Sequence, residues 1–423
     1  MERIKNIVFD FDGTLLDTAQ QIMATIHATV TEMGLPPKTD EEYKSSIGLR
    51  LEDTPQFLWP GVEAAAAYAT IYRRVFNGLK DTIVAKCFPG VRETLDYLRR
   101  NGYRMAVATS RSRSSLVEYL TSLGLDDYFE MLVGGGDVSL GKPAPDPVLM
   151  IMDACAWEAR ETMTVGDAPV DILMGRAAGT ATCAVTYGNG TEDELRGADP
   201  DYIIHDFEAL IPILAGVHPD IVEYVEREIL PRYDSFDKAH HRDHARMVIR
   251  QSLSLARPLP LLDTDMVYCI AAYHDTGLVN GREFHHIDSG RILASDEFLR
   301  SRFSPEDIET MRRAVEDHRA SGKTAPRNDY GKVVADADRH IDARTIIRRT
   351  IQYGLANYPD LDRRGHFERT LSHLTAKYGP EGYLRVWLPW SDNAARLKAL
   401  HALIADIESL KRIFDDIFDR ETV

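Results

Sequence analysis

Residues 5–14 read Lys-Asn-Ile-Val-Phe-Asp-Phe-Asp-Gly-Thr, a short apolar run that ends in two carboxylates, a glycine and a threonine. The run predicts a buried β-strand, and Gly13 permits the tight turn that follows it. Because the carboxyl ends of parallel strands form the edge where α/β sheets carry their sites, Asp10 and Asp12 are candidates for chemistry. One carboxylate can attack phosphorus and form an aspartyl-phosphate. The other can protonate the leaving group and later activate water.

Four further short apolar runs follow in the first half of the chain, and helical patterns separate them. Short strands that alternate with helices predict a parallel sheet covered on both faces. Helical patterns at 18–33 and 62–79 interrupt the alternation, so residues 15–85 are expected to form a helical insert after the first strand. The four runs are 104–108, 131–133, 163–165 and 182–185.

Polar residues lie at or just beyond the ends of these predicted strands. Thr109 and Ser110 end the second strand, where hydroxyl and N–H groups can hold a phosphoryl oxygen. Lys142 can supply a fixed positive charge to the nucleophile and the phosphate. Asp167 and Asp171 follow the fourth strand, where carboxylates can hold Mg²⁺ together with the first aspartate.

Residues 4–214, with these motifs in this order, resemble the haloacid dehalogenase superfamily, and the insert resembles the cap of its phosphoglycolate phosphatase and β-phosphoglucomutase group. The resemblance implies a nucleophile at Asp10, an acid–base at Asp12 and phosphate ligands at Thr109, Ser110 and Lys142. It also implies a Mg²⁺ site, with Asp171 either in its outer layer or at the ion. The Mg²⁺ residues are Asp10, Asp12 through its backbone carbonyl, Asp167 and Asp171.

Three positions narrow the chemistry within that superfamily. Dehalogenases and phosphonoacetaldehyde hydrolases lack an acid at the Asp12 position, so its presence favours phosphoryl transfer. Sugar-phosphate mutases carry a histidine where this chain has Ile22, which argues against a mutase. Arg50 would lie on the cap, either in contact with an anionic group of the substrate or as a solvated arginine.

The pattern changes near residue 216, after which strand signals almost vanish. We therefore predict two domains, an α/β domain over 1–216 with its cap at about 15–85, and an all-α domain over 217–423. Tyr383, Trp387 and Trp390 are expected in helices that cover the second core. Helical patterns occupy 221–229, 241–256, 265–273, 287–295, 305–318, 344–353 and 393–417.

The second half also contains an ordered series of histidines and aspartates. Imidazole and carboxylate together suit Fe, Mn, Zn, Co or Ni. An apolar helix that ends in His274-Asp275 puts two polar groups in an apolar core, which is costly unless something pairs with them. Residues 220–345 resemble the HD-domain superfamily. The residues of the series are His244, His274, Asp275, His286, His318 and Asp338.

The HD resemblance implies that four of these residues form the basic metal set, and that His286 and His318 are the extra ligands of binuclear members. His286 is preferred to its neighbour His285, because the run from His286 onward matches the usual sequence of the family. Asp338 is preferred to Asp336 for the last ligand, since an Ala-Asp-Arg segment is the common form of that motif.

Composition excludes several classes of protein. The 423 residues carry a net charge of −16, which argues against general nucleic-acid binding. No apolar run approaches the roughly 20 residues of a membrane span, and residues 1–6 lead into the first strand without a signal-peptide pattern. The four cysteines show no paired spacing, so a cytoplasmic protein with reduced thiols is expected.

The leading hypothesis is a bifunctional hydrolase. A Mg²⁺-dependent phosphomonoesterase for small phosphorylated metabolites would be fused to an HD phosphohydrolase that uses one or two divalent transition metals on a nucleotide or phosphodiester. Two alternatives keep the phosphatase and change the second half, which would be a di-iron oxygenase or a ligand-binding regulatory domain.

Overall fold

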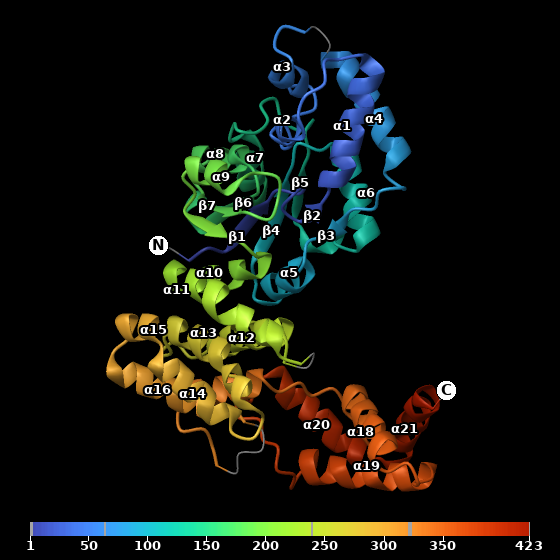
Figure 1. Ribbon diagram of the computed structural model, residues 1–423, viewed down its shortest axis with the longest axis vertical. Coiled ribbons are helices and arrows are strands. Elements are labelled where there is room, and N and C mark those ends of the chain that lie inside the picture. Colours follow the sequence, from blue (N-terminus) through green and yellow to red (C-terminus); the bar gives the residue numbers. More distant parts are fainter. Residues whose placement is uncertain (1–2, 63–64, 238–239, 320–323, 423) are drawn as a thin grey trace. The chain divides into compact units, whose positions relative to one another are not determined.

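The computed structural model describes residues 3–62, 65–237, 240–319 and 324–422. The chain divides into two compact units, Met1–Pro219 and Asp220–Val423 (Figure 1). In the described ranges, no helix combines the length and the apolar character that a membrane crossing requires.

The first unit is built on a six-stranded parallel sheet, as the sequence predicted. Its central strand β1 is buried at all four residues and lies between β4 and β6. The chain builds β4 and β5 on one side of β1, then β6, β7 and β8 on the other, so the carboxyl end of β1 lies at a topological switch point. In spatial order the strands are β5 Met131–Val133, β4 Arg104–Ala108, β1 Asn6–Phe9, β6 Thr162–Gly166, β7 Ala181–Val185 and β8 Tyr202–Ile204.

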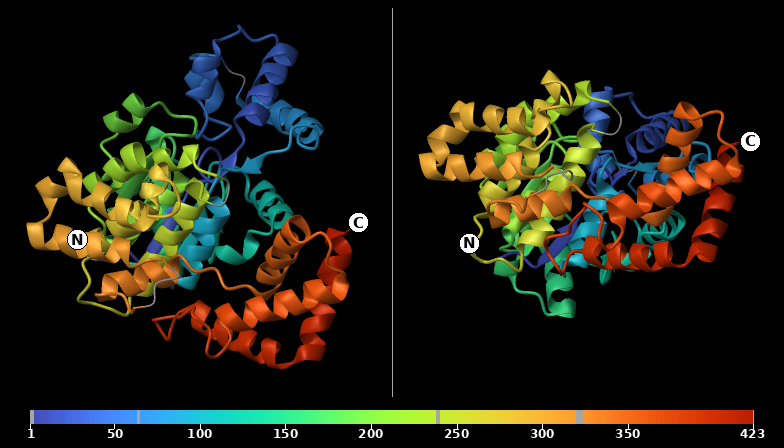
Figure 2. Two further views of the ribbon diagram at one scale, coloured as in Figure 1. Left: turned by 60° about the horizontal axis from the view of Figure 1, so that its bottom comes forward. Right: turned by 90° about the horizontal axis from the view of Figure 1, so that it is seen from below.

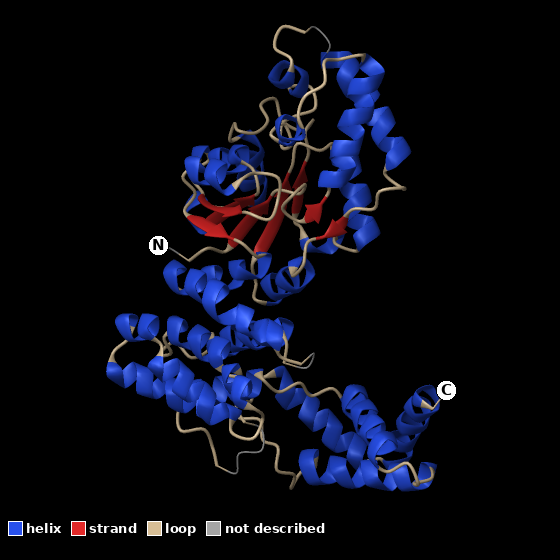
Figure 3. Cartoon of the chain, in the orientation of Figure 1, coloured by secondary structure: helices blue, strands red, loops and turns tan. Residues whose placement is uncertain are grey.

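Helices cover both faces of this sheet (Figure 3). Alternate residues of β1 point to opposite faces, because strand side chains alternate. Val8 joins a core with Ile151 and Met174 on one face, and the Phe9 ring lies 5.7 Å from the Phe207 ring on the other. The helices are α5 Val91–Arg100, α6 Arg113–Leu123, α7 Asp146–Cys155, α8 Pro169–Ala177, α9 Glu192–Gly197 and α10 Leu210–Ala215.

The insert after β1 is helical, and a two-stranded antiparallel sheet joins it to the sheet domain. Strands β2 (Leu16–Asp17) and β3 (Lys86–Cys87) pair antiparallel and bracket the insert. Its own core includes the side chains of Ile22, Trp59 and Tyr68, so the cap is held together independently of the sheet. The cap helices are α1 Ala19–Met33, α2 Asp40–Lys44, α3 Thr54–Leu58 and α4 Ala65–Leu79.

The second unit is helical throughout its described residues, as predicted. Helix α13 (Thr264–Tyr273) is buried from Met266 to its end and forms the centre of the HD region. Its carboxyl end therefore delivers the next two residues into the interior. Around it lie α11 Pro219–Tyr224, α12 Arg242–Ala256, α14 His285–Ser295, α15 Glu297–Arg302, α16 Pro305–Glu316 and α17 Asp329–Ala337.

Four further helices form a C-terminal bundle with a core of its own, which Figure 2 shows in red and orange. The single helix expected over 393–417 is wrong. The helix is interrupted at Asp406. The carboxylate of Asp406 accepts a hydrogen bond from the N–H of Ser409 and caps the start of the last helix. The helices are α18 Ala343–Asn357, α19 Arg363–Tyr378, α20 Asp392–Ala405 and α21 Ile407–Glu421.

The expectation for Tyr383, Trp387 and Trp390 is also wrong. All three lie in the loop between α19 and α20 and not in helices. The Trp390 indole donates to the Leu255 carbonyl at 3.1 Å, while 53% of Tyr383 is exposed.

Candidate active sites

Three carboxylates meet where β1 and β6 end. Asp10 follows β1, Asp167 follows β6, and Asp171 lies in the first turn of α8. One oxygen from each lies within 4.8 Å of the others, and all three residues are buried. The Lys142 ammonium pairs with Asp10 and, at 2.6 Å, with Asp171. A single lysine therefore faces three carboxylates, which leaves an excess of negative charge.

The electrostatics of this cluster favour an added cation. Burial raises the pKa of Asp10, and the neighbouring carboxylates add to the effect against Lys142. Burial and the charge of Asp171 raise the pKa of Asp167 to about 6. Burial opposes the charge on Lys142, but its two aspartate partners outweigh that effect and raise the pKa of the lysine. An all-oxygen donor set with surplus negative charge is typical of a Mg²⁺ site.

Two turns, one after β1 and one after β7, fix the position of Asp167. The Thr14 hydroxyl donates to one oxygen at 2.9 Å, and Asn189 donates to the other from its backbone N–H at 2.7 Å and its side chain at 2.9 Å. Asn189 was not among the predicted site residues. Its signal was the Gly-Asn-Gly turn that follows the fifth predicted strand.

Of the other predicted substrate residues, Thr109 and Ser110 lie on the same edge of the sheet, and Arg50 lies on the cap. Thr109 is buried directly after β4. The Ser110 hydroxyl donates to the Gly48 carbonyl of the cap at 2.6 Å. Arg50 donates to the Ser139 carbonyl at 3.0 Å and pairs with a cap aspartate.

A cavity of about 670 Å³ lies between the cap and this edge of the sheet. Asp10, Asp12 and Thr109 line one side, and Arg50 lines the cap side. The cavity is therefore open to the carboxylates and large enough for a small metabolite.

Arg111 is a residue of this cavity that the sequence analysis did not select. It pairs with Asp12 through two nitrogens, at 2.5 and 3.0 Å. Burial opposes its charge, but Asp12 outweighs that effect and raises the pKa of the guanidinium. The available signal was its position directly after the Thr-Ser pair at the end of a strand.

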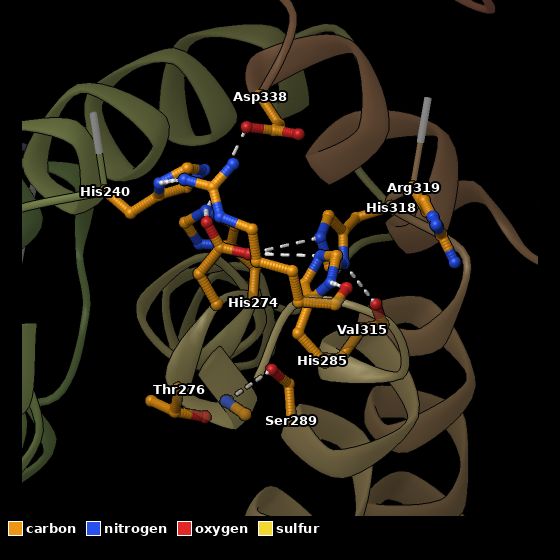
Figure 4. A network of polar contacts seen from close by, with 12 residues as sticks. His240, His274, Thr276, His285, Ser289, Val315, His318, Arg319 and Asp338 are labelled. Atoms are coloured by element: carbon orange, nitrogen blue, oxygen red, sulfur yellow. Dashed lines mark hydrogen bonds and ion pairs between the residues drawn. The ribbon is translucent and has the colours of Figure 1, made fainter. Parts of the chain in front are cut away.

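In the HD region, histidines and aspartates from α12, from α14 and from just beyond the carboxyl ends of α13, α16 and α17 lie together (Figure 4). They form two groups of three, and within each group the candidate ligand atoms lie within 4.8 Å of one another. The first group contains His244, His274 and Asp338, and the second contains Asp275, His285 and His318.

Asp275 faces both groups at once. Its Oδ2 lies 3.4 Å from His274 Nε2 and 3.7 Å from His244 Nε2. Its Oδ1 lies 3.5 Å from Nε2 of both His285 and His318. The arrangement can hold two cations with one carboxylate between them.

Three of the histidines are oriented by backbone carbonyls. Nδ1 of His274, His285 and His318 lies 2.7, 2.8 and 2.6 Å from the carbonyls of the residues three positions earlier. Because a carbonyl can only accept, each Nδ1 carries a hydrogen, and Nε2 is the ring nitrogen that each histidine can offer to a metal. All three Nε2 atoms lie at the cluster, as metal binding requires.

The preference for His286 over His285 disagrees with this geometry. Both lie in the first turn of α14, where successive side chains point about 100° apart, so only one of them can face the cluster. His285 is that one, while His286 belongs to neither group and its buried Nδ1 has no hydrogen-bond partner. Its pKa falls to about 4, chiefly through burial.

Asp338 and Asp336 have separate surroundings. Asp338 Oδ1 lies 3.1 Å from His244 Nε2, inside the cluster. The Asp336 carboxylate points away and accepts the backbone N–H groups of Trp387 and Leu388 and a bond from Arg339.

The HD cluster stabilises positive charge despite its burial. Burial alone would lower the pKa of His274, but Asp275 and Asp338 raise it to about 9. Burial opposes the ionised form of Asp275, yet His274 and His318 lower its pKa. A mixed set of imidazole and carboxylate donors fits a transition metal better than Mg²⁺.

The chain matches two known families, one in each half. The haloacid dehalogenase-like hydrolase family matches residues 7–185, and the HD domain matches residues 242–341. The chain is 34% identical over 212 residues to a protein of Dickeya dadantii (strain 3937) named "Probable phosphatase IndB", covering 48% of this chain and 91% of that one. It is 31% identical over 216 residues to a phosphoglycolate phosphatase of Yersinia pestis, covering 50% and 93%.

Among solved structures, a haloacid dehalogenase-like family hydrolase from Streptococcus pneumoniae matches 50% of this chain and 99% of its own, at 24% identity and a TM-score of 0.46. The sequence relatives define the class. The chain belongs to the haloacid dehalogenase-like hydrolases, enzymes that here act on phosphoric ester bonds, and it carries an HD domain in its second half.

Proposed function

We propose that the protein is a bifunctional phosphohydrolase, with a Mg²⁺-dependent phosphomonoesterase in a domain over 1–216 and a metal-dependent HD phosphohydrolase in a domain over 217–423. The observation that carries the proposal is the presence of two clusters of candidate metal ligands of different chemistry. One is all carboxylate and adjoins a cavity that Thr109 and Ser110 line, and the other mixes histidine with aspartate.

In the first site, Asp10 is the nucleophile that attacks phosphorus and forms an aspartyl-phosphate. Asp12 protonates the leaving oxygen and then takes a proton from the water that cleaves the intermediate. Lys142, Thr109 and Ser110 hold the phosphoryl oxygens. Mg²⁺, when bound, would add neutralising charge. It would be held by Asp10, Asp167, Asp171 and the backbone carbonyl of Asp12.

The cap would exclude water from the aspartyl-phosphate before the second step. Arg50 carries part of this role, because it lines the cavity and also bonds to the Ser139 carbonyl of the sheet domain. A small phosphorylated metabolite is the substrate that a cavity of about 670 Å³ accommodates.

In the HD site, the ligands would be His244, His274, Asp275, His285, His318 and Asp338. One or two divalent transition metals of the Fe, Mn, Zn, Co and Ni group would supply a Lewis acid and a nucleophilic water. The hydrogen bonds from Nδ1 to backbone carbonyls keep the imidazoles pointed at the cluster. Asp275 lies beside both groups of ligands and would connect them. The proposed substrate is a nucleotide or a phosphodiester.

We also propose a cytoplasmic location, since all four cysteines are free thiols. The partners would be small phosphorylated metabolites, with no general binding of nucleic acid because the net charge is −16.

The phosphomonoesterase is tested by phosphate release from sugar phosphates, phosphoglycolate and nucleotides with Mg²⁺. Asp10→Asn removes the nucleophile with little change in shape, and it should lower the rate at least ~1,000-fold because the covalent route is lost. Equal rates for the wild type and Asp10→Asn on every monoester would contradict the proposal. Asp17→Asn is a matched control that should keep the rate of the wild type, because Asp17 is exposed in β2.

A further inference from the structure

Both ligand groups of the HD cluster are open to solvent. Three of the six candidate ligands keep part of their side chains exposed, and these are His244, Asp338 and His285, at 18%, 22% and 16%. The side chains of the other three are at most 5% exposed. His244 and Asp338 belong to one group and His285 to the other. A ligand from solvent can therefore reach both groups, and the residues beside the exposed ligands would meet it first.

The Arg282 side chain extends from one group toward the other. Its backbone carbonyl accepts a hydrogen bond from Nδ1 of His285 at 2.8 Å, which places its backbone beside the second group. Its Nη2 lies 3.3 Å from Nδ1 of His240, and the centroid of the His240 ring lies 5.9 Å from that of His244 in the first group. Figure 4 shows His240 and His285 on either side of His274. The positive charge of Arg282 is therefore held at the exposed edge of the cluster.

The Arg282 guanidinium keeps hydrogen-bond donors for a ligand. Its contacts with Asp237, at 2.5 Å, and with His240 both use Nη2, so Nε and Nη1 have no partner among the residues that the structure describes. The pair with Asp237 is exposed, at 68% for the arginine side chain and 52% for the aspartate. Ion pairs between exposed side chains contribute little to stability. The guanidinium can therefore turn toward an anion at the cluster at small cost.

Two further arginines close to the ligands are engaged elsewhere. Arg242 pairs with both oxygens of Asp234 through two nitrogens. Arg319 donates to a backbone carbonyl at 3.0 Å, and Figure 4 shows it on the opposite side of the cluster from His240. Of these three arginines, Arg282 is the one whose contacts lie beside both ligand groups.

We propose that Arg282 binds the phosphoryl group of the substrate at the HD site. Its N–H groups donate to a phosphoryl oxygen on the solvent side, while the other oxygens face the ligand cluster. A guanidinium suits this role because it is always charged and its planar set of donors matches the oxygens of a phosphate. The substrate class is thus an organic phosphate, since a neutral polyol would offer the arginine no anion. The inference rests on the proposed HD phosphohydrolase and adds the residue that recognises its substrate.

The test measures the binding of inorganic phosphate to the Mn²⁺-loaded protein by equilibrium dialysis. Binding that is lost in Asp275→Ala belongs to the HD cluster, so phosphate held by the first site is subtracted. Asp275→Asn takes its place if thermal unfolding shows that the alanine variant is not folded. In Arg282→Gln, the Kd of the HD-dependent phosphate should rise about 10–100-fold, the size expected for a hydrogen bond between charged groups. Arg282→Lys should weaken binding less, because it keeps the charge and loses the planar set of donors.

Metal content is the second measurement, and it should equal that of the wild type in both Arg282 variants because Arg282 is not a ligand. Arg291→Gln is the matched control. Arg291 lies on α14, its side chain is 73% exposed, and it pairs with Asp288 at 3.1 Å. This variant should bind phosphate as the wild type does.

An unchanged Kd in Arg282→Gln would overturn the inference. Equal weakening in Arg291→Gln would also overturn it, since a general loss of surface charge would then be the cause. Weaker binding together with a loss of metal would mean that Arg282 only supports His285. Failure of the proposed HD function looks different, because the wild type and Asp275→Ala would then bind phosphate equally.

Discussion

Gly13 leaves no space for a side chain beside the reacting carboxylates. Its φ is +88°, and a Cβ at this position would lie 2.1 Å from an Asp167 oxygen and 2.2 Å from the Asn189 amide nitrogen. The Asn189 amide donates a hydrogen bond to this Asp167 oxygen at 2.9 Å. A single methyl group would therefore displace part of the proposed Mg²⁺ site.

Gly13→Ala should reduce the phosphomonoesterase about 100-fold or more, since a displacement of about 1 Å in a reacting group has that effect. Phosphate release measures the activity, and thermal unfolding measures the stability. Gly102→Ala is the control, because Gly102 has a similar φ of +79° but no atom within 4 Å of its Cβ position. Similar activity losses in both variants would show that backbone strain, and not the crowded site, is responsible.

The two adjacent histidines of α14 give a second test on single residues. His285→Ala should remove a ligand from the Asp275–His318 group and lower the metal content of the purified protein by about half, since each group offers one site. His286→Ala should leave the metal content near that of the wild type, because its ring lies outside both groups. Elemental analysis after dialysis measures both, and the reverse order would contradict the assignment.

Residues that carry chemistry by type and order could be predicted from the sequence, and those that depend on orientation could not. The geometry brings together most of the predicted ligands, because Asp10, Asp167 and His274 follow strongly apolar elements whose ends are easy to find. The choice between His285 and His286 depended on where α14 begins, which shifts the facing side chain by about 100°. Arg111 was missed because its role depends on contact with Asp12, 99 residues away.

Among the helices, α17 links the HD cluster to the C-terminal bundle. Its Asp336 is completely buried and accepts the backbone N–H groups of Trp387 and Leu388. Asn393, at the start of α20, donates to the carbonyls of Asp336 and Arg339 at 3.0 and 2.6 Å. These bonds fasten the loop before α20 to the end of α17, where Asp338 follows as the C-terminal cap residue.

Asp336→Ala should lower the free energy of unfolding of the second unit by about 3–5 kcal/mol, because Arg339 and two buried N–H groups would lose their partner. Burial already raises the pKa of this carboxyl against those bonds, so a smaller loss is expected for Asp336→Asn. Urea unfolding followed by tryptophan fluorescence gives the value. Asp329→Ala, which breaks an exposed pair with Lys332 on the same helix, should change the stability by less than about 1 kcal/mol. Equal effects of the two alanine variants would contradict the account.

Short apolar runs located most strands of the large sheet, and the bounds predicted for β4 agree with the structure at both ends. Strand β8 was missed, although β5, which is as short and lies at the other edge of the sheet, was predicted. The boundary between α20 and α21 was also missed. The apolar pattern continues across Asp406, and the boundary is marked only by the hydrogen bond from the Ser409 N–H to the Asp406 carboxylate.

Over the whole molecule, the fold class is confirmed: a parallel α/β sheet domain is followed by a helical HD region. The change of pattern near residue 216 lies close to the division between the two units at Pro219 and Asp220. Substrates were not predictable from the sequence, because they depend on the size and charge of cavities. Each unit contains a cluster of side chains that could hold a metal ion, so we expect two activities that can be lost separately.

The most direct measurement of that claim is phosphate release by the wild type, Asp10→Asn and Asp275→Ala, each with Mg²⁺, Mn²⁺ and Fe²⁺. Monoesters, nucleotides and phosphodiesters are the substrates. Asp10→Asn should abolish the cleavage of monoesters and spare the cleavage of a diester or nucleotide, and Asp275→Ala should do the reverse. Loss of both activities in one variant would contradict two independent sites. An Asp275→Ala protein with every hydrolytic activity intact would contradict a phosphohydrolase in the HD domain.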